Sequence, residues 1–212
     1  ILNYLLTIIW ITGITNAINW LDGLDGLAAG INIIISIALS LIAYGNNHLA
    51  LSIICIALAG SNLGFLIFNY YPSKILMGDC GSYFNGFTIS SLSIMSTKIA
   101  INSYSSSSLK PQFIIALLIL SLPIIDMFKV IMQRIINKKS PFYPDRNHLH
   151  YILIDVGLNH KITVNFMYTL CFSLCSLGLY IYDEKYKQIF IISLLLSLLY
   201  LIYNLRKIKT IN

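Results

Sequence analysis

The stretch IFIISLLLSLLYLI, residues 189–202, decides the fold class of this chain because it is apolar almost throughout. It lacks the period-two alternation of a membrane β-strand, and so does IIALLILSL at residues 114–122. Across all 212 residues, 57% are hydrophobic, only 10% are charged, and the mean hydropathy is +0.77. Ordinary soluble domains do not have this composition. The sequence therefore predicts an all-α protein, a polytopic bundle of transmembrane helices.

A helix needs about 20 apolar residues to cross the hydrocarbon core of a bilayer. We expect a single transmembrane domain that covers residues 1–212 and contains seven such spans. The expected spans are residues 1–18, 27–44, 49–68, 82–101, 112–136, 162–182 and 188–205. The span 82–101 is the most polar, with several serines, Asn85 and Lys98. A polar face inside the bundle or near an interface would accommodate it.

Three polar segments interrupt the apolar runs. The first polar segment is Asn16–Gly26, the second is Met77–Ser82, and the third is Pro144–His150. Two expected spans separate each segment from the next, so all three return to the same face of the membrane. The sequence thus predicts one site, assembled from segments that are distant along the chain.

The basic residues indicate which face of the membrane this is. The formal net charge is +6, but the Lys and Arg residues are scattered along the edges of the spans, which is typical of topology signals and not of a nucleic-acid site. Ten of the 14 fall on the side of the polar segments: Lys74, Lys129, Arg134, Lys138, Lys139, Arg146, Lys161, Arg206, Lys207 and Lys209. The remaining ones are Lys98, Lys110, Lys185 and Lys187. We therefore expect cytoplasmic site loops on a multi-pass protein of the cell (inner) membrane.

In the first polar segment, Asn19, Asp22 and Asp25 recur at every third residue. A short helical turn would bring all three to one side. They could instead be helix caps and turn formers, because Asp-Gly pairs favour turns. Two tandem Asp-Gly pairs are more than capping needs, and carboxylates at membrane depth usually mark a functional site.

The second polar segment contains Gly78-Asp79-Cys80-Gly81-Ser82 at the start of an expected span. Asp79 could be a simple N-cap, with Ser82 completing the turn. Glycines also let the backbone approach a ligand closely, and a helix N-terminus attracts phosphate. A carboxylate at that position suits a bridging Mg²⁺, which is the interpretation we favour.

The third polar segment lies in the longest loop, residues 137–161, and carries Arg146, His148 and His150. Guanidinium and imidazole groups can bind phosphate oxygens and sugar hydroxyls. A zinc site from the two histidines is disfavoured, because no third His or Cys lies nearby in the sequence. Just upstream, Asp126 and Lys129 are spaced i, i+3 on one helix face, so we expect Asp126 to form an internal salt bridge or a contact within the bundle.

These segments carry a family resemblance. Residues 16–30, 69–86 and 140–150 resemble, in order, three motifs of the polyprenyl-phosphate N-acetylhexosamine-1-phosphate transferases, glycosyltransferase family 4. The third segment is similar to the branch that uses UDP-N-acetylglucosamine. The resemblance implies transfer of a sugar 1-phosphate from a UDP-N-acetylhexosamine to polyprenyl (undecaprenyl) phosphate, releasing UMP and initiating cell-envelope polysaccharide synthesis, with Mg²⁺ or Mn²⁺ as cofactor.

The resemblance also implies roles for individual residues. Metal ligands would be Asn19 and Asp79; catalytic carboxylates would be Asp22, Asp25 and Asp79; substrate-binding residues would be Asp25, Asn69, Arg146, His148 and His150. Among the substrate-binding residues, Asp25 and Asn69 would line the uridine pocket, and the basic residues would bind the sugar and its phosphate.

One departure from the family pattern matters for activity. The family carries an adjacent aspartate pair upstream, and this sequence has no Asp-Asp; its adjacent acids, Asp183-Glu184, are expected at the opposite membrane face. We therefore expect a C-terminal portion of a longer enzyme, inactive by itself. A non-catalytic fragment and an ion-coupled transporter are the alternatives, although a transporter predicts paired interrupted helices that we do not find. The sequence leaves open whether the protein forms a homodimer.

Overall fold

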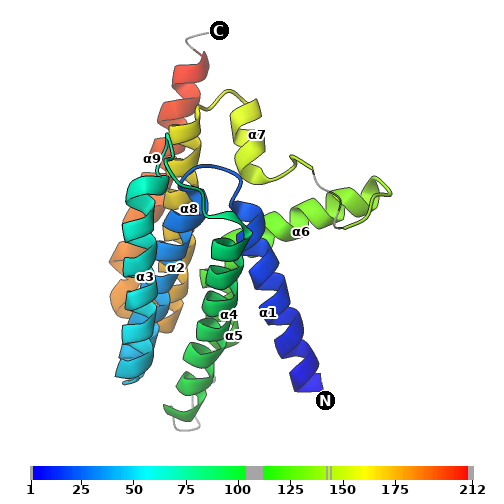
Figure 1. Cartoon of the computed structure of the whole chain (residues 1–212). Helices are drawn as coiled ribbons and strands as arrows, with labels where there is room; N and C mark the ends of the chain where they lie inside the picture. Colours follow the sequence, from blue (N-terminus) through cyan, green and yellow to red (C-terminus); the bar gives the residue numbers. More distant parts are fainter. Residues whose placement is uncertain (1, 104–111, 142, 144, 210–212) are drawn as a thin grey trace.

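The computed structural model describes residues 2–103, 112–141, 143 and 145–209, with the backbone alone at 97–103, 112 and 205–209. Every regular element in these ranges is helical, as predicted (Figure 1). The elements are α1 (Leu2–Leu21), α2 (Leu27–Gly45), α3 (Leu49–Asn69), α4 (Gly78–Ser103), α5 (Gln112–Ile119), α6 (Ser121–Ile136), α7 (Leu149–Asp155), α8 (His160–Tyr182), the short 3-10 helix η1 (Glu184–Tyr186) and α9 (Lys187–Lys209).

In the part of the chain that the structure describes, fewer helices than the seven expected spans meet the test of length and hydropathy. Within the described residues, five helices are long and apolar enough to cross a membrane: α1, α2, α3, α8 and the segment 184–204 that includes α9. Helices α5 and α6 pass the same test only together, and they are bent by 76° at a break, so the number is at most six. Helix α4, expected as the span 82–101, is not among them because its polar residues lower its hydropathy.

Helix α4 turns its polar residues into the bundle, as expected. Ser82, Ser90, Ser93 and Ser96 are fully buried. Several of these hydroxyls bond to the backbone of their own helix, and the indole Nε1 of Trp10 in α1 donates to Ser93 Oγ at 3.0 Å. Small polar residues of this kind allow close helix packing, and their side chains can form hydrogen bonds within the bundle.

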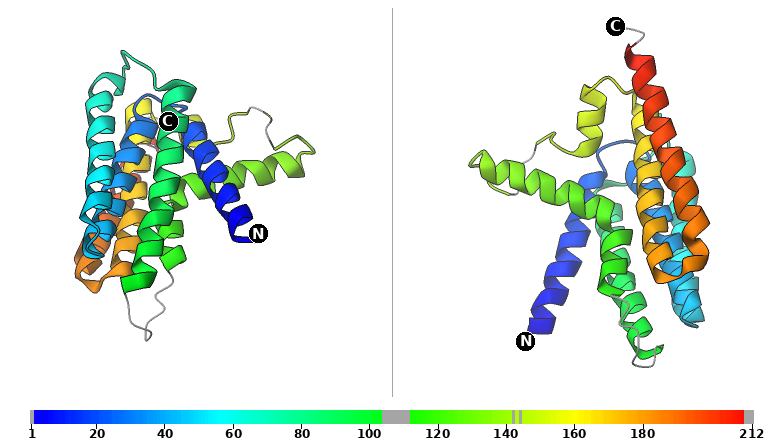
Figure 2. Two further views of the ribbon diagram at one scale, coloured as in Figure 1. Left: turned by 60° about the horizontal axis from the view of Figure 1, so that its bottom comes forward. Right: turned by 180° about the vertical axis from the view of Figure 1, so that it is seen from behind.

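Helix α2 lies at the centre of the bundle, between α3 and α8 (Figures 1 and 2). It is apolar on nearly all sides, which is typical of a helix surrounded by others. Gly30 makes the contact with α8 possible, because a Cβ there would lie 2.2 Å from the ring of Tyr168. The Tyr168 hydroxyl donates to the carbonyl of Gly26 at 2.6 Å.

The bend between α5 and α6 has a cause in the sequence. Pro123 has no N–H to donate to the carbonyl of Ile119, and its ring clashes with that carbonyl in a straight helix. The Cys175 thiol of α8 donates to this carbonyl instead, at 3.5 Å. The apolar run 112–136 is therefore not a straight helix but two helices joined at a sharp bend.

Beyond the bend, α6 leaves the bundle sideways (Figures 1 and 2). Its outer face is apolar and exposed, and consists of Ile125, Phe128, Met132, Ile135 and Ile136. Its inner face buries Asp126, Val130 and Arg134. This amphipathic pattern is typical of a helix at the boundary between lipid and water.

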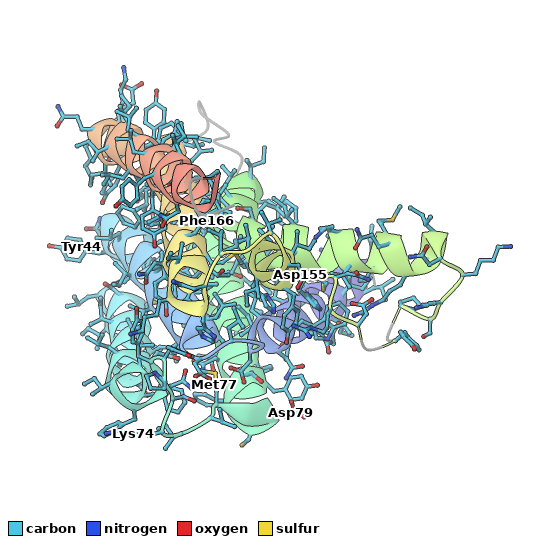
Figure 3. All side chains as sticks on the ribbon, turned by 90° about the horizontal axis from the view of Figure 1, so that it is seen from above. Tyr44, Lys74, Met77, Asp79, Asp155 and Phe166 are labelled. Carbon is cyan, nitrogen blue, oxygen red and sulfur yellow. The ribbon has the colours of Figure 1, made fainter. Side chains whose placement is uncertain are left out.

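All three polar segments lie at one end of the bundle, as predicted. Helix α1 ends there, α4 begins there, and α7 lies over them (Figure 1). Met77, Asp79 and Asp155 come into view together when the molecule is seen from that end (Figure 3). Helix α8 runs from this end to Tyr182, so Asp183 and Glu184 lie at the other end, also as predicted.

Candidate active site

The first and second polar segments enclose a cavity of about 310 Å³. It lies between the α1–α2 turn and the α3–α4 connection. Its lining residues are Asp22, Gly23, Leu24, Asp25, Asn69, Leu76, Gly78 and Asp79. The structure thus brings the three predicted catalytic carboxylates and Asn69 to one cavity, which we call the acidic cavity.

Asn19 connects the two polar segments. Its side-chain Nδ2, in the last turn of α1, donates to Asp79 Oδ1 at 3.0 Å and to Ser82 Oγ at 2.9 Å. Asp79 lies within the first turn of α4 and is not its N-cap, because the helix already begins at Gly78, whose φ of +61° favours glycine. Since Nδ2 is committed to these bonds, Asn19 Oδ1 is the amide atom that could bind a cation.

Asp25 and Asn69 hold the α3–α4 connection against the α1–α2 turn. Asp25 Oδ2 accepts from the backbone N–H of Ser73 at 3.0 Å. Asn69 Oδ1 accepts from the N–H of Gly26 at 3.0 Å, and its Nδ2 donates to the carbonyl of Ile75 at 2.8 Å. Both side chains therefore shape the acidic cavity as well as line it.

The acidic cavity is electrostatically unfavourable for anions. Burial raises the pKa of Asp22 to about 6; a hydrogen bond from the backbone of Gly78 opposes this shift, and the charges of Asp79 and Asp25 add to it. A carboxyl group with a raised pKa beside other carboxylates, in a cavity, is a common feature of functional sites. A divalent cation would relieve this repulsion.

The donor set fits Mg²⁺ better than a metal that needs a cage of protein ligands. Among the residues described, no group of three or more His, Cys, Asp or Glu side chains is arranged to hold a metal ion. Mg²⁺ is usually bound by one or two carboxylates, and substrate phosphates and waters complete its shell. Asp79 and Asn19 Oδ1 meet that smaller requirement.

A second cavity, of about 370 Å³, adjoins the first. It lies between the end of α1, the inner face of α6 and the start of α7. Its lining residues are Asn16, Trp20, Tyr83, Arg134, Tyr143, Asp145, His148 and Tyr151. We call it the aromatic cavity. The Tyr151 hydroxyl donates to the carbonyl of Gly23 at 3.3 Å, and Gly23 lines the acidic cavity, so this contact separates the two spaces.

The three predicted residues of the third polar segment lie in different surroundings. His148 lines the aromatic cavity. Arg146 is exposed, and its guanidinium lies 4.8 Å from the centre of the Tyr151 ring. His150 is fully buried in the wall, where an added Cβ on Gly23 would lie 2.5 Å from its Nε2. Burial is the main cause that lowers the pKa of His150 to about 4.

Asp126 makes an internal contact, as expected, but its partner is His148 and not Lys129. Asp126 Oδ2 lies 2.7 Å from His148 Nδ1, and Asp126 Oδ1 accepts from the backbone N–H of Leu149 at 2.6 Å. Lys129 Nζ donates to the carbonyl of Asn147 at 2.9 Å. Helical spacing alone missed these partners because the loop after α6 folds back over its inner face.

Arg134 is a further site residue that sequence reasoning missed. Its Nε and one terminal nitrogen bind the Asp145 carboxylate at 2.9 and 3.2 Å, and its other terminal nitrogen donates to the carbonyl of Pro141. Its guanidinium also lies 4.8 Å from the centre of the Trp20 ring. The ion pair holds the pKa of Asp145 below its ordinary value. One sequence pattern could have identified Arg134 as a site residue: α6 has charged residues on one face and apolar residues on the opposite face.

Comparison with known proteins identifies similar sequences. Residues 1–97 match the family model described as Glycosyl transferase family 4. A probable undecaprenyl-phosphate N-acetylglucosaminyl 1-phosphate transferase of Bacillus subtilis (strain 168) is 39% identical over 169 residues, 80% of this chain and 45% of the relative. A decaprenyl-phosphate N-acetylglucosaminephosphotransferase of Mycobacterium leprae (strain TN) is 35% identical over 176 residues, 77% of this chain and 44% of the relative.

Another relative matches a shorter stretch. A phospho-N-acetylmuramoyl-pentapeptide-transferase of Clostridium perfringens (strain 13 / Type A) is 47% identical over 73 residues, which is 34% of this chain and 23% of the relative. The chain spans less than half the length of each of these curated relatives.

Proposed function

The chain belongs to glycosyl transferase family 4, and on that premise we propose that the protein transfers N-acetylglucosamine 1-phosphate from a UDP-sugar to polyprenyl phosphate. In this reaction an oxygen of the lipid phosphate attacks the phosphorus next to the sugar. The pyrophosphate bond breaks, UMP leaves, and a lipid-linked pyrophosphoryl sugar forms. The reaction would take place at the cytoplasmic face of the cell membrane, a location that the excess of Lys and Arg on the side of the site supports.

The observation that carries the proposal is the pairing of an acidic cavity with an adjoining cavity that contains His148 and aromatic rings. Attack of one phosphate on another brings two anions together, so catalysis depends on positioning and on charge neutralisation. Asn19 and Asp79 would hold Mg²⁺, which supplies positive charge to the pyrophosphate. Asp22 would lie beside the reacting phosphates.

The remaining predicted residues divide between nucleotide and sugar. Asp25 and Asn69 line the acidic cavity and would bind uridine; Asp25 keeps Oδ1 for this, since Oδ2 is bound to Ser73. His148 and Arg146 would bind the sugar and its phosphate in the aromatic cavity and at its rim. For His150 the same role stays a prediction, because its ring is buried behind Gly23.

The test is transfer of radiolabel from UDP-N-acetylglucosamine to undecaprenyl phosphate in membranes, with MgCl₂ or with EDTA. It would compare this chain with a form extended by any upstream coding sequence. The proposal expects Mg²⁺-dependent label in the lipid extract with release of UMP, and loss of both in Asp79→Asn. Label that persists in EDTA, or no transfer in either form, would contradict it.

A further inference from the structure

Both carboxylate oxygens of Asp126 contact residues of the third polar segment. One lies 2.7 Å from Nδ1 of His148, and the other accepts the backbone N–H of Leu149 at 2.6 Å. Asp126 and His148 are only 3% and 5% exposed. Since an ionised carboxylate can only accept hydrogen bonds, His148 must carry a proton on Nδ1 in this arrangement.

The second bond fixes the backbone beside the histidine. Helix α7 begins at Leu149, and its N-cap residue, His148, makes no side-chain capping bond. The first N–H groups of a helix need acceptors from outside the helix. Asp126 of α6 supplies one of them, and the neighbouring Lys129 binds the carbonyl of Asn147. Three consecutive residues, Asn147, His148 and Leu149, are thereby hydrogen-bonded to one face of α6.

The rest of the His148 ring is held by aromatic contacts. The Trp20 ring meets it edge-on with centres 5.8 Å apart, and the His150 ring stacks on it at 5.5 Å. With Nδ1 turned to Asp126, Nε2 is the ring nitrogen left for a group bound in the aromatic cavity, which His148 lines. A carboxylate that orients the second nitrogen of a functional histidine is a recurrent arrangement in proteins.

We propose that Asp126 is the positioning residue of the site: it fixes the tautomer and the orientation of His148, so that Nε2 faces the sugar phosphate of the substrate. The substrate part of this inference rests on the proposed function, whereas the tautomer does not. Asp126 itself touches neither cavity and acts only through His148.

The tautomer can be measured without any enzymatic activity. The chain has four histidines, so ¹⁵N-histidine labelling in detergent micelles gives few signals, and His148→Ala identifies the one of interest. We expect protonated Nδ1 in the wild type and in Asp126→Glu, and loss of Nδ1 protonation in Asp126→Asn, whose amide can donate to this atom. Lys129→Met is the matched control: it frees the loop carbonyl but should keep the tautomer. An unprotonated Nδ1 in the wild type, or an unchanged one in Asp126→Asn, would overturn the inference.

The role in catalysis is tested by a double-mutant cycle in the transfer assay. Asp126→Asn should lower kcat/KM by about 10- to 100-fold in the wild-type background, the usual effect of losing such an orienting partner. In the His148→Ala background it should cause less than about a 2-fold further loss, because its effect passes through the imidazole. Equal losses in both backgrounds would show a purely structural role. Absence of transfer in every form would refute the proposed function but leave the tautomer result standing.

Discussion

Replacing Asp22 by asparagine should stabilise the protein at neutral pH in the absence of metal, while removing the proposed transfer activity. The folded chain raises the pKa of Asp22 from 3.8 to about 6, chiefly by burial. Between those values the folded carboxyl retains a proton that the unfolded chain has lost. Stability therefore falls as pH rises through this window, and the full penalty is present above about pH 6. At complete burial the shift would correspond to about 3 kcal/mol, but Asp22 is partly exposed, so we expect about 1–2 kcal/mol.

The assay is thermal unfolding in detergent micelles with EDTA, at about pH 7.5 and at about pH 4. For a chain of this length, 1–2 kcal/mol corresponds to a rise of about 2–8 °C in Tm. Asp22→Asn should show this rise at the higher pH and little difference at the lower one, where wild-type Asp22 is protonated. Asp155→Asn, at an exposed carboxylate on α7, is the matched control and should behave as the wild type. A Tm for Asp22→Asn at or below the wild-type value at pH 7.5 would refute the reasoning.

Three further predictions test other parts of the site. MgCl₂ should raise the Tm of the wild type, because a ligand that binds only the folded state stabilises it, and Asp79→Asn should abolish this rise. Gly30→Ala should cost about 1–3 kcal/mol in thermal unfolding, because its Cβ would overlap the Tyr168 ring; an unchanged Tm would contradict the described packing of α2 on α8. Arg134→Met should cost about 1–3 kcal/mol by leaving Asp145 unpaired, and limited proteolysis should then cut within residues 137–147; resistance equal to the wild type would argue against this anchor.

Hydropathy predicted the helical class and most of the helix boundaries, because burying backbone groups in lipid leaves few alternatives to a helix. It could not predict the bend between α5 and α6. Both halves are apolar, so a sliding window joins them, and only the missing N–H of Pro123 separates them. It also predicted a membrane span at α4, a long helix whose buried serines interrupt the apolar run.

The acidic cavity was predictable from sequence because its residues lie within two short segments. Asn19, Asp22 and Asp25 are spaced at helical intervals, and Asp79 opens the next polar segment. The prediction that the first and second polar segments lie close together needed only the rule that two spans return the chain to the same side of the membrane. The surroundings of His148 and His150 were not predictable in this way. They depend on a loop that folds back over α6, and a sequence pattern does not show whether a histidine faces a cavity or lies inside its wall.

The two cavities also differ in how they are held, and this difference has a functional consequence. The acidic cavity is built by hydrogen bonds among α1, α3 and α4, such as Asn19–Asp79 and Asn69–Gly26. The aromatic cavity depends on α6, which holds the loop through Asp126 and Arg134. Because the two assemblies use separate anchors, loosening α6 should impair sugar binding while leaving cation binding intact. Under the proposed function, that separation would let Mg²⁺-dependent stabilisation and sugar-nucleotide affinity be perturbed one at a time.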